Sequence, residues 1–452
     1  MKKYVLPLVI LTGYAPALAD VKAPEPNLAY QIVEGLTTEV GQRLAGTEAE
    51  ARARDWGVAK LKALGFANVH IEPYDMPVWV RGAETAEVVV PYPQKLALTA
   101  LGNSGATPEV GLSAEVIAFS SLAELKSAPD AAIKGKIVYV THQMMGTQDG
   151  SSYGYFGPVR FIGPSIAAKK GAAAYLLRSL GTNEHRVPHT GVTDWEKGVA
   201  PIPAAALSVP DAENIDRMLA RAGQPIVIHL TLTPKFTGTH TSGNVIAEVP
   251  GSDPAAGIVV IGGHLDSWDL GTGAIDDGAG VAITTAAAHR LLAGSPPKRT
   301  IRVVWWGSEE EGGFGSDAYF KAHRTEKHVM AAESDFGADR VWAFSTKVPD
   351  SANSFTDRLA TALAPLGIVA DKRAAHGGAD VEKLIEAGAA VVDLRQDGTH
   401  YFDIHHTADD TLDKIDPAQM QQNVEAWAVF LKLAANAPED FIAKSRAGVV
   451  AK

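Results

Sequence analysis

Short apolar runs alternate with helix-like stretches from Thr239 onward, and this alternation constrains the fold more than any other feature of the sequence. The run "GIVVIGG" precedes "VAITTAAAHRLLAG", and "TIRVVWWG" precedes "SDAYFKAHR"; "HVMAAES" and "AAVVDLR" are further short runs. Strands that are apolar throughout are typical of parallel sheets, because helices cover both faces. The pattern predicts an α/β domain with a largely parallel, buried sheet flanked by helices.

Two helices are marked by their ends. The stretch from Glu48 to Leu64 is helix-like and Gly65 closes it, after which "ANVHIEPYDMPVWV" alternates like a strand. A last helix is predicted from Asp416 as N-cap, followed by Pro417 at the first helical position and Gln419 in a capping-box pattern. Core packing is expected for the apolar residues that recur along it at helical spacing: Met420, Val424, Trp427, Leu431 and Ala434.

The sequence pattern of the chain changes between about Pro108 and Lys235. Short strand-like runs such as "GKIVYVTH", "AAAYLLRS" and "PIPAAALS" alternate there with Gly, Pro and Ser clusters. At 452 residues the chain is long enough for roughly two to three domains. We therefore expect an inserted β-rich domain over residues 108–237, between an N-terminal part of the main domain (20–107) and a catalytic domain (238–452).

The N-terminus reads as a secretory signal peptide. Lys2 and Lys3 precede an apolar run, and Ala17-Leu18-Ala19 forms a small-x-small cleavage signal, so cleavage is predicted after Ala19. The apolar run is too short for a membrane span. We expect a secreted or periplasmic protein without a membrane anchor once residues 1–19 are removed.

Charge and cysteine content restrict the possible partners and metal ligands. Removal of residues 1–19 takes away two lysines and no acidic residue, so the formal charge changes from −11 to −13. A body this acidic argues against nucleic acid or an anionic membrane as a partner. The chain has no cysteine, which excludes disulfides, thiolate zinc ligands and a cysteine nucleophile. Any metal site must be built from His, Asp and Glu.

Histidines and carboxylates follow four of the predicted strand ends or loops. They occur in "GGHLDSWDLGTGAIDDGAG", "WWGSEEEGG", "ESDFG" and "FDIHHTADDT". Each alone has an ordinary interpretation, since an Asp-Asp-Gly is commonly a turn and a histidine after a strand is commonly a satisfied polar residue. Ligands of α/β sheets bind beyond the carboxyl ends of the strands, so together these residues indicate a metal site. Carboxylates and imidazoles suit zinc, manganese or cobalt, and two metals about 3.5 to 4 Å apart can share a carboxylate.

These four motifs, in this order and spacing, resemble those of the M28-type co-catalytic zinc peptidases. Within that family the chain is most similar to the secreted carboxypeptidase Q group, also called plasma glutamate carboxypeptidase. The motif-bearing resemblance covers about Ser242 to Leu433, and the segment before it resembles the protease-associated domain of this group by position and texture. The resemblance implies a zinc-exopeptidase fold and two Zn²⁺ ions per chain, with other divalent ions as alternatives.

Carried over position by position, the resemblance implies specific roles. His264, Asp276 and Asp335 would bind one zinc, and Asp276, Glu310 and His406 the other, so that Asp276 bridges. Glu309 matches the general acid/base, which takes a proton from the metal-bound water and passes it to the leaving amine. Asp266 matches the carboxylate that orients the imidazole of His264.

The neighbouring polar residues have weaker assignments. Tyr401 is a candidate for oxyanion stabilisation, and His405 is either a substrate contact or a structural neighbour. Asp277 is expected to cap the following helix or its turn, and Asp409 and Asp410 to stabilise the turn around His406. Glu311 is expected to be a structural or solvated neighbour. Two further polar residues, in "HGGAD", match the family only loosely and stay outside the predicted site: His376 and Asp380.

The resemblance and the residues together predict a secreted di-zinc exopeptidase that hydrolyses dipeptides or short peptides. An acidic site favours a substrate with a free α-amine, so we expect aminopeptidase or dipeptidase action rather than carboxypeptidase action. One alternative is a catalytically inactive receptor or scaffold on the same fold, although no ligand position or Glu309 is missing. Another is a single-zinc enzyme of the glutaminyl cyclase type, which metal stoichiometry would distinguish. A homodimer fits the resemblance.

Overall fold

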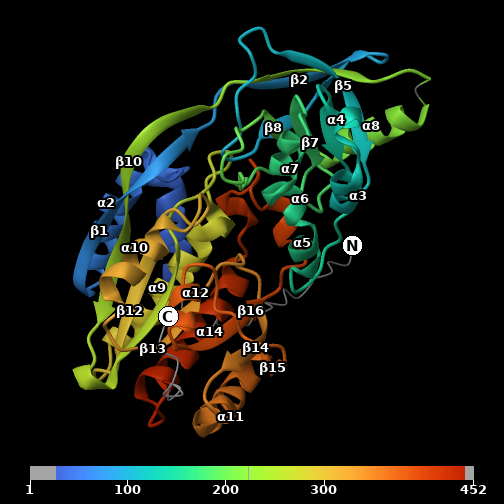
Figure 1. Cartoon of the computed structure of the whole chain (residues 1–452). Helices are drawn as coiled ribbons and strands as arrows, with labels where there is room; N and C mark the ends of the chain where they lie inside the picture. Colours follow the sequence, from blue (N-terminus) through green and yellow to red (C-terminus); the bar gives the residue numbers. More distant parts are fainter. Residues whose placement is uncertain (1–26, 222, 443–452) are drawn as a thin grey trace, which may run out of the picture.

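The first of two eight-stranded sheets carries the predicted α/β pattern. In this computed structural model, which describes residues 27–221 and 223–442, its strand order is β1-β10-β12-β11-β13-β16-β14-β15 (Figure 1). Strands β12, β11, β13 and β16 run parallel to one another, whereas β1, β10 and β14 join by antiparallel pairing. The strands are β1 (Ala67–Val80), β10 (Lys235–Val249), β11 (Ile258–His264), β12 (Thr300–Trp306), β13 (His328–Glu333), β14 (Val341–Lys347), β15 (Val369–Ala370) and β16 (Ala390–Gln396). The sheet is mixed, with the predicted parallel strands at its centre.

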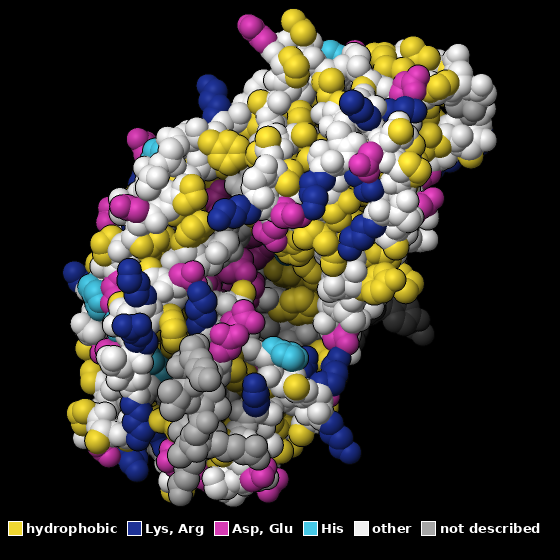
Figure 2. All heavy atoms as spheres, in the orientation of Figure 1, with side chains coloured by type: hydrophobic (Ala, Val, Ile, Leu, Met, Phe, Trp, Pro, Cys, Tyr) yellow, Lys and Arg dark blue, Asp and Glu magenta, His cyan; other side chains and the backbone are white. Residues whose placement is uncertain are grey.

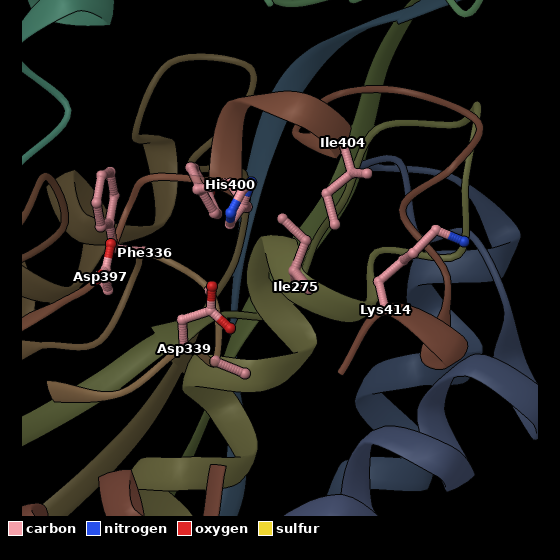
Figure 3. Close-up of a pocket in the computed structure, with 10 residues that line it drawn as sticks. Ile275, Phe336, Asp339, Asp397, His400, Ile404 and Lys414 are labelled. Carbon is pink, nitrogen blue, oxygen red and sulfur yellow. The ribbon is translucent and has the colours of Figure 1, made fainter. Parts of the chain in front are cut away.

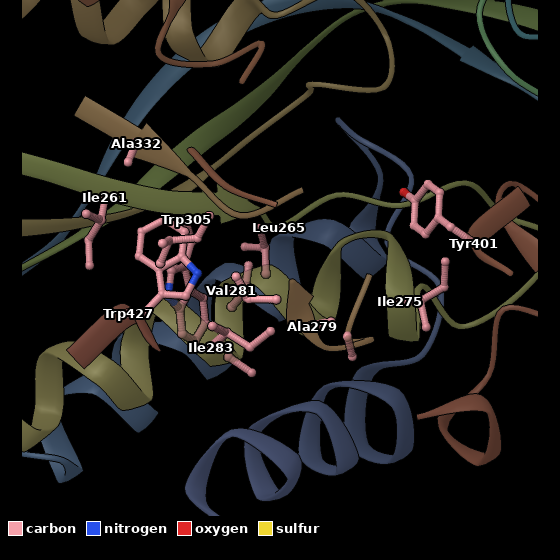
Figure 4. Close-up of a cluster of buried hydrophobic side chains, with 14 of the residues drawn as sticks. Ile261, Leu265, Ile275, Ala279, Val281, Ile283, Trp305, Ala332, Tyr401 and Trp427 are labelled. Atoms are coloured by element: carbon pink, nitrogen blue, oxygen red, sulfur yellow. The ribbon is translucent and has the colours of Figure 1, made fainter. Parts of the chain in front are cut away.

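Helices cover both faces of the first sheet. Consecutive side chains of a strand point to opposite faces, and Trp305 and Trp306 accordingly enter two different buried clusters. Trp305 packs in the cluster that contains Trp427, whereas Trp306 packs with Tyr319 (Figure 4). The helices of this part are α1 (Leu28–Gly35), α2 (Glu48–Ala63), α9 (Ala279–Leu292), α10 (Phe314–His323), α11 (Asn353–Leu363), α12 (Glu382–Glu386), α13 (Tyr401–Ile404) and α14 (Pro417–Asn436).

The second sheet, with strand order β3-β2-β9-β5-β6-β7-β8-β4, begins before the predicted boundary at residue 108. Its strands are β2 (Glu84–Val90), β3 (Gln94–Leu96), β4 (Leu98–Ala100), β5 (Leu112–Phe119), β6 (Ile137–Val140), β7 (Ala174–Arg178), β8 (Ala204–Leu207) and β9 (Val227–Leu232). Strands β2 to β4 lie in this sheet because β2 pairs with β9 and β4 with β8. The segment is also richer in helix than predicted, with α3 (Leu122–Ser127), α4 (Asp130–Ile133), α5 (Ser151–Phe156), α6 (Pro158–Phe161), α7 (Gly163–Lys169) and α8 (Val209–Arg221).

A long two-stranded ribbon connects the two sheets. Strands β1 and β10 pair antiparallel from Ala67 opposite Glu248 to Val80 opposite Lys235, so the chain enters and leaves the second sheet at one place (Figure 1). The space-filling view shows a hollow between the two parts, where acidic side chains gather beside hydrophobic ones (Figure 2). The arrangement places the second sheet over the edge of the first sheet at which the predicted metal ligands lie.

The two helices predicted from their ends are present. Helix α2 ends at Ala63, and Gly65 takes a φ of 84°, a left-handed conformation that favours glycine. At the start of α14 the carboxylate of Asp416 accepts hydrogen bonds from the N–H groups of residues 418 and 419. The predicted capping box is incomplete, because the Gln419 side chain accepts from Arg340 N instead of returning to Asp416. The five apolar residues predicted to pack along this helix are all buried.

The predicted signal peptide, with cleavage after Ala19, lies outside the described residues. Within residues 27–221 and 223–442, no helix combines the length and the apolar character that a membrane crossing requires.

Candidate metal centre

Three neighbouring parallel strands bring most of the predicted ligands to one edge of the first sheet. Strand β11 ends at His264, β12 leads into Glu309 and Glu310, and β13 leads into Asp335. Because β12 and β13 both pair parallel with β11, their carboxyl ends lie side by side. Here the structure follows the rule that sites of α/β sheets form at the carboxyl ends of strands.

Asp276 lies between two imidazoles. Its Oδ1 is 3.1 Å from His264 Nε2, and its Oδ2 is 3.1 Å from His406 Nε2. Beyond His406, Glu310 Oε2 lies 2.9 Å from the same Nε2 atom, and beyond His264, Asp335 Oδ1 lies 3.5 Å from that Nε2 atom. The five predicted ligands therefore form two sets that share Asp276.

The donor atoms fit divalent cations. Ligand atoms of His264, Asp276 and Glu310 lie within 4.8 Å of one another, as do those of Asp276, His405 and His406 and those of His264, Asp277 and Asp335. Glu310 Oε1 is buried without a hydrogen-bond partner, and Asp276 Oδ2 has no hydrogen bond of acceptable geometry. Buried carboxylate oxygens without partners are costly unless a cation balances them. Carboxylate and imidazole donors are also those that zinc takes in cysteine-free sites.

Burial and neighbouring charge shift the pKa values of these groups in opposite directions. Burial would raise the pKa of Asp276, but the imidazoles of His264 and His406 outweigh it and hold that pKa well below its usual value. Burial would lower the pKa of His406, but the carboxylates of Glu310 and Asp276 raise it to about 9. Burial raises the pKa of Glu309 well above its usual value, and the Asp335 carboxylate adds to the increase. Groups that titrate so far from their ordinary range are typical of functional sites.

A turn after β12 positions Glu309 and Glu310, the first two glutamates of "EEE". Ser308 takes a φ of 60°, which is uncommon for a residue other than glycine. The two oxygens of the Asp266 carboxylate accept the backbone N–H groups of Glu309 and Glu310, each at 3.2 Å. Trp268 Nε1 donates to Glu310 Oε2 at 2.6 Å and fixes that side chain on the His406 side.

Asp266 is nearest to His264 through its backbone carbonyl oxygen, and its carboxylate lies farther from the imidazole. His264 Nδ1 lies 3.0 Å from the backbone carbonyl oxygen of Asp266, whereas the nearer carboxylate oxygen is 3.7 Å away. That carboxylate is already engaged by the two glutamate N–H groups. Asp266 therefore contacts His264 through its main chain, and its side chain shapes the Glu309-Glu310 turn.

Three acidic neighbours show how the surrounding loops are held. Asp277 accepts Gly280 N at the start of α9, as predicted, and its second oxygen accepts His264 N. Asp410 Oδ1 accepts the N–H groups of residues 274 and 275, so it holds the loop that carries Asp276. Asp409 instead faces His185 of the second part, with 3.1 Å between Oδ2 and Nδ1.

Tyr401 and His405 both lie at the centre. His405 stacks on His406 with ring centroids 3.5 Å apart, and its Nε2 is 3.4 Å from Asp276 Oδ2. Tyr401 is buried against Phe336, and burial together with Asp276 raises the pKa of its phenol well above the usual value. A phenol that stays protonated keeps its O–H available as a hydrogen-bond donor.

Glu311 is not a solvated neighbour. Its side chain is buried, its Oε2 has no hydrogen-bond partner, and burial raises its pKa well above the usual value. A similar pair, Glu333 and Asp380, lies beside the centre: Glu333 Oε2 accepts Asp380 N, while both Asp380 carboxylate oxygens lack hydrogen bonds. Asp380 stayed outside the predicted site because "HGGAD" matches the family only loosely.

Three residues of the second part reach the centre, and the sequence analysis named none of them. Tyr153 of α5 stacks on Phe402, with ring centroids 4.5 Å apart. Arg160 of α6 is buried with its Nη1 atom 3.3 Å from His406 Nδ1, and Thr190 O lies 3.3 Å from the same atom. These contacts join segments more than 200 residues apart, and no local pattern marks them.

Two cavities lie next to the centre. One of about 260 Å³ is lined by Glu309 and Asp380, together with residues at the start of α10 and α12. A smaller one of about 60 Å³ is lined by Ile275, Phe336 and Tyr401, and Figure 3 shows polar side chains around its other sides. Glu309 is thus partly accessible, whereas Glu310 is buried.

Comparisons with known proteins identify the family of the chain. The model of peptidase family M28 matches residues 244–431. Carboxypeptidase Q of Bos taurus is 36% identical over 91% of this chain and 86% of its own length. A solved M28 peptidase precursor from Shewanella amazonensis is 48% identical, with a TM-score of 0.90 over 92% of this chain and 94% of its own. A zinc aminopeptidase from Bacillus subtilis has the same fold, with a TM-score of 0.64 and 21% identity over 92% of this chain and 97% of its own. The chain therefore belongs to peptidase family M28, a family of metallopeptidases.

Proposed function

We propose that this protein is a secreted di-zinc exopeptidase that removes residues from peptides, or splits dipeptides, at a free α-amine. The observation that carries the proposal is the placement of Asp276 between His264 and His406, 3.1 Å from each, with a further carboxylate beyond each imidazole. His264, Asp276 and Asp335 would hold one ion and Asp276, Glu310 and His406 the other. Zinc bound there would polarise the scissile carbonyl and lower the pKa of water.

Glu309 is the general acid/base in this proposal. Its neighbours Asp266 and Ser308 fix its backbone, and its side chain borders the 260 Å³ cavity, where a substrate has room. Its raised pKa suits a group that must take up a proton from the attacking water and release it to the leaving amine. Tyr401, whose O–H stays protonated, would donate to the oxyanion.

The acidic surroundings favour a positively charged substrate end. Glu309 and Asp380 line the 260 Å³ cavity beside the centre, and both carboxyl oxygens of Asp380 lack a hydrogen-bond partner, so they can accept hydrogen bonds from an α-ammonium group. The zinc aminopeptidase with the same fold supports this direction, whereas the name carboxypeptidase Q points to the opposite end of the substrate. We propose that the part of the chain that contains the second sheet is a protease-associated-like domain, and that it restricts the access of substrates to the metal centre.

The test compares two neighbouring glutamates. Glu309→Gln is expected to lower kcat on unblocked dipeptides by about 10²–10⁴-fold, because general acid–base catalysis contributes that much. Metal content, measured by elemental analysis, should stay at two zinc ions per chain. The matched control is Glu311→Gln, which changes a buried carboxylate that faces neither imidazole. Wild-type activity in the metal-loaded Glu309→Gln variant would refute the proposal.

Substrate panels separate the remaining alternatives. N-blocked peptides should be cleaved far more slowly than unblocked ones if the free α-amine is recognised. One zinc ion per wild-type chain, with release of cyclised N-terminal glutamine, would favour the glutaminyl cyclase type of enzyme. Two bound zinc ions without hydrolysis of any peptide in the panel would favour an inactive scaffold.

A further inference from the structure

We infer that Thr190, in the segment between β7 and β8, is a positioning residue for His406, so that the second sheet contributes to metal binding in the first. The two residues contact each other twice: Thr190 N donates to His406 O at 3.0 Å, and His406 Nδ1 lies 3.3 Å from Thr190 O. We call this pair of contacts the 190–406 clasp. It joins the two sheets directly at a proposed ligand.

The backbone of His406 needs such support. Its φ is 60°, in the left-handed region that residues other than glycine seldom adopt. Conformations of this kind persist only where the surrounding structure holds them. The hydrogen bond from Thr190 N to His406 O holds the main chain at that residue, and the contact from Nδ1 to Thr190 O holds the ring.

The clasp also leaves the other ring nitrogen of His406 facing the centre. With Nδ1 beside Thr190 O, Nε2 lies 3.1 Å from Asp276 Oδ2 and 2.9 Å from Glu310 Oε2, on the side where a metal would bind.

Thr190 is itself anchored by its side chain. Its hydroxyl donates to Ala100 O at 2.8 Å and accepts from Arg81 Nη2 at 3.1 Å. Arg81 is held in turn by Asp269, 2.8 Å away, in the loop between β11 and α9. The nearby Thr182 and Asn183 donate to Phe402 O, Asp403 Oδ1 and Asp403 O, so the whole segment lies against the loop that carries His406.

The test is stepwise Zn²⁺ titration of the full-length protein against a chromophoric chelator. Thr190→Val keeps the main-chain contacts of the clasp but removes the hydroxyl that anchors the segment to Ala100 and Arg81. The less firmly held segment should weaken one of the two zinc sites by about 10-fold, the lower end of what partners of metal ligands contribute. The site of His264 and Asp335 should keep its affinity. The visible spectrum of the Co²⁺-substituted protein should change for the weakened site alone.

Thr107→Val is the matched control. Thr107 is also buried in the second sheet, and its hydroxyl donates to Leu232 O and accepts Leu232 N, both at 3.1 Å. The substitution is the same but the position is not near the clasp, so both zinc affinities should equal those of the wild type. Arg160→Met removes the guanidinium that lies near both Thr190 O and His406 Nδ1, so it loosens both sides of the clasp; it should weaken the same zinc site and serves if Thr190→Val does not fold.

The inference rests on the proposed two-metal centre. The titration distinguishes a failure of the proposed function from a failure of the inference alone. A single zinc site in the wild-type protein would overturn the proposed function and the inference with it. Two wild-type sites with unchanged affinities in Thr190→Val, or in Arg160→Met if only that variant folds, would overturn the inference alone. Equal weakening of both sites would also overturn it, because the clasp touches only His406.

Discussion

The two sheets have the same parallel core but different residues at the strand ends. In the first sheet, β11, β12 and β13 lead into His264, Glu309 and Glu310, and Asp335. In the second sheet, β5, β6, β7 and β8 are also parallel, and each is followed by a hydroxyl residue: Ser120, Thr141, Ser179 and Ser208. Each hydroxyl has a hydrogen-bond partner within the second part.

The comparison shows that sheet architecture provides a place for a site, and the strand-end residues decide whether one exists. In the second sheet these hydroxyls bond to two carboxylates, a carbonyl oxygen and a backbone N–H, and among the described residues the groups of His, Asp and Glu that could hold a metal ion all lie in the first part. In the first sheet Glu310 Oε1 and Asp276 Oδ2 are buried and unsatisfied. A satisfied polar group stabilises the fold, and an unsatisfied one is available for a ligand.

The largest expected effect is a loss of activity on substitution of Asp276 in the first part, compared with Asp216 in the second part. Asp276→Asn removes the shared carboxylate, and kcat/KM on unblocked dipeptides should fall by at least about 10³-fold, since bound metal contributes several kcal/mol of transition-state stabilisation. Zinc content should fall with it. Asp216→Asn, at the Thr141 hydroxyl of the second sheet, should stay within about threefold of wild type. Equal losses in the two variants would break the comparison.

A smaller effect is expected at a strand end of the second sheet. Ser208 Oγ accepts Asp211 N in the first turn of α8, as an N-cap does. Ser208→Ala should therefore lower the free energy of unfolding by about 1 kcal/mol, as measured by urea denaturation, while kcat/KM and zinc content stay unchanged. A loss of zinc in this variant would contradict the comparison, because it would show that a strand end of the second sheet contributes to metal binding.

The smallest expected effect is on the free energy of unfolding, and it concerns Glu439, a carboxylate of the first part that is paired with an arginine. Arg358 donates to both oxygens of Glu439, at 2.7 and 2.8 Å, and this lowers the pKa of Glu439 to about 2. Because the folded pKa lies below the unfolded value, the pair stabilises the protein above about pH 4.5, and this stabilisation is lost as the pH falls toward 2. Arg358→Ala should cost at most about 1 kcal/mol at pH 7, because Arg358 is partly exposed.

Urea denaturation at pH 7 and pH 3 checks the Arg358 prediction. The difference between Arg358→Ala and wild type should shrink at the lower pH. Arg217→Ala is the control, since Arg217 Nη1 lies 3.9 Å from the nearest oxygen of Glu213 and should contribute little at either pH. A difference for Arg358→Ala that grew at pH 3 would contradict the assigned pKa direction.

Local patterns were sufficient for the parts of the molecule that depend on neighbours in sequence. The strand over residues 67–80, helices α2 and α14, and the strand ends at His264 and Glu309 follow from periodicity, caps and residue type. These features are decided within about 15 residues, which is the range of such patterns. The meeting of the predicted ligands at one edge followed from the rule for parallel strands.

Features that depend on distant pairing were not predictable in this way. The second sheet starts before the predicted boundary at residue 108 because β2 pairs with β9 and β4 with β8, and no local pattern shows pairing over such a distance. The Asp266 carboxylate turned to Glu309 and Glu310, 43 and 44 residues away, rather than to its neighbour His264. Arg160 and Thr190 carry no motif, and only the contact between the two parts places them at His406.

Arg43 and Asp410, from opposite ends of the chain, hold the loop that carries Asp276. This buried side chain donates to the backbone carbonyls of Leu265, Thr272 and Gly273, and so ties the N-terminal part to the loop that carries Asp276. Asp410 holds the same loop from the other end of the chain. Contacts over such sequence separations form late, because the entropy of closing long loops opposes them. In a chain synthesised from its N-terminus, the loop that carries Asp276 cannot reach its final shape until residue 410 has been made.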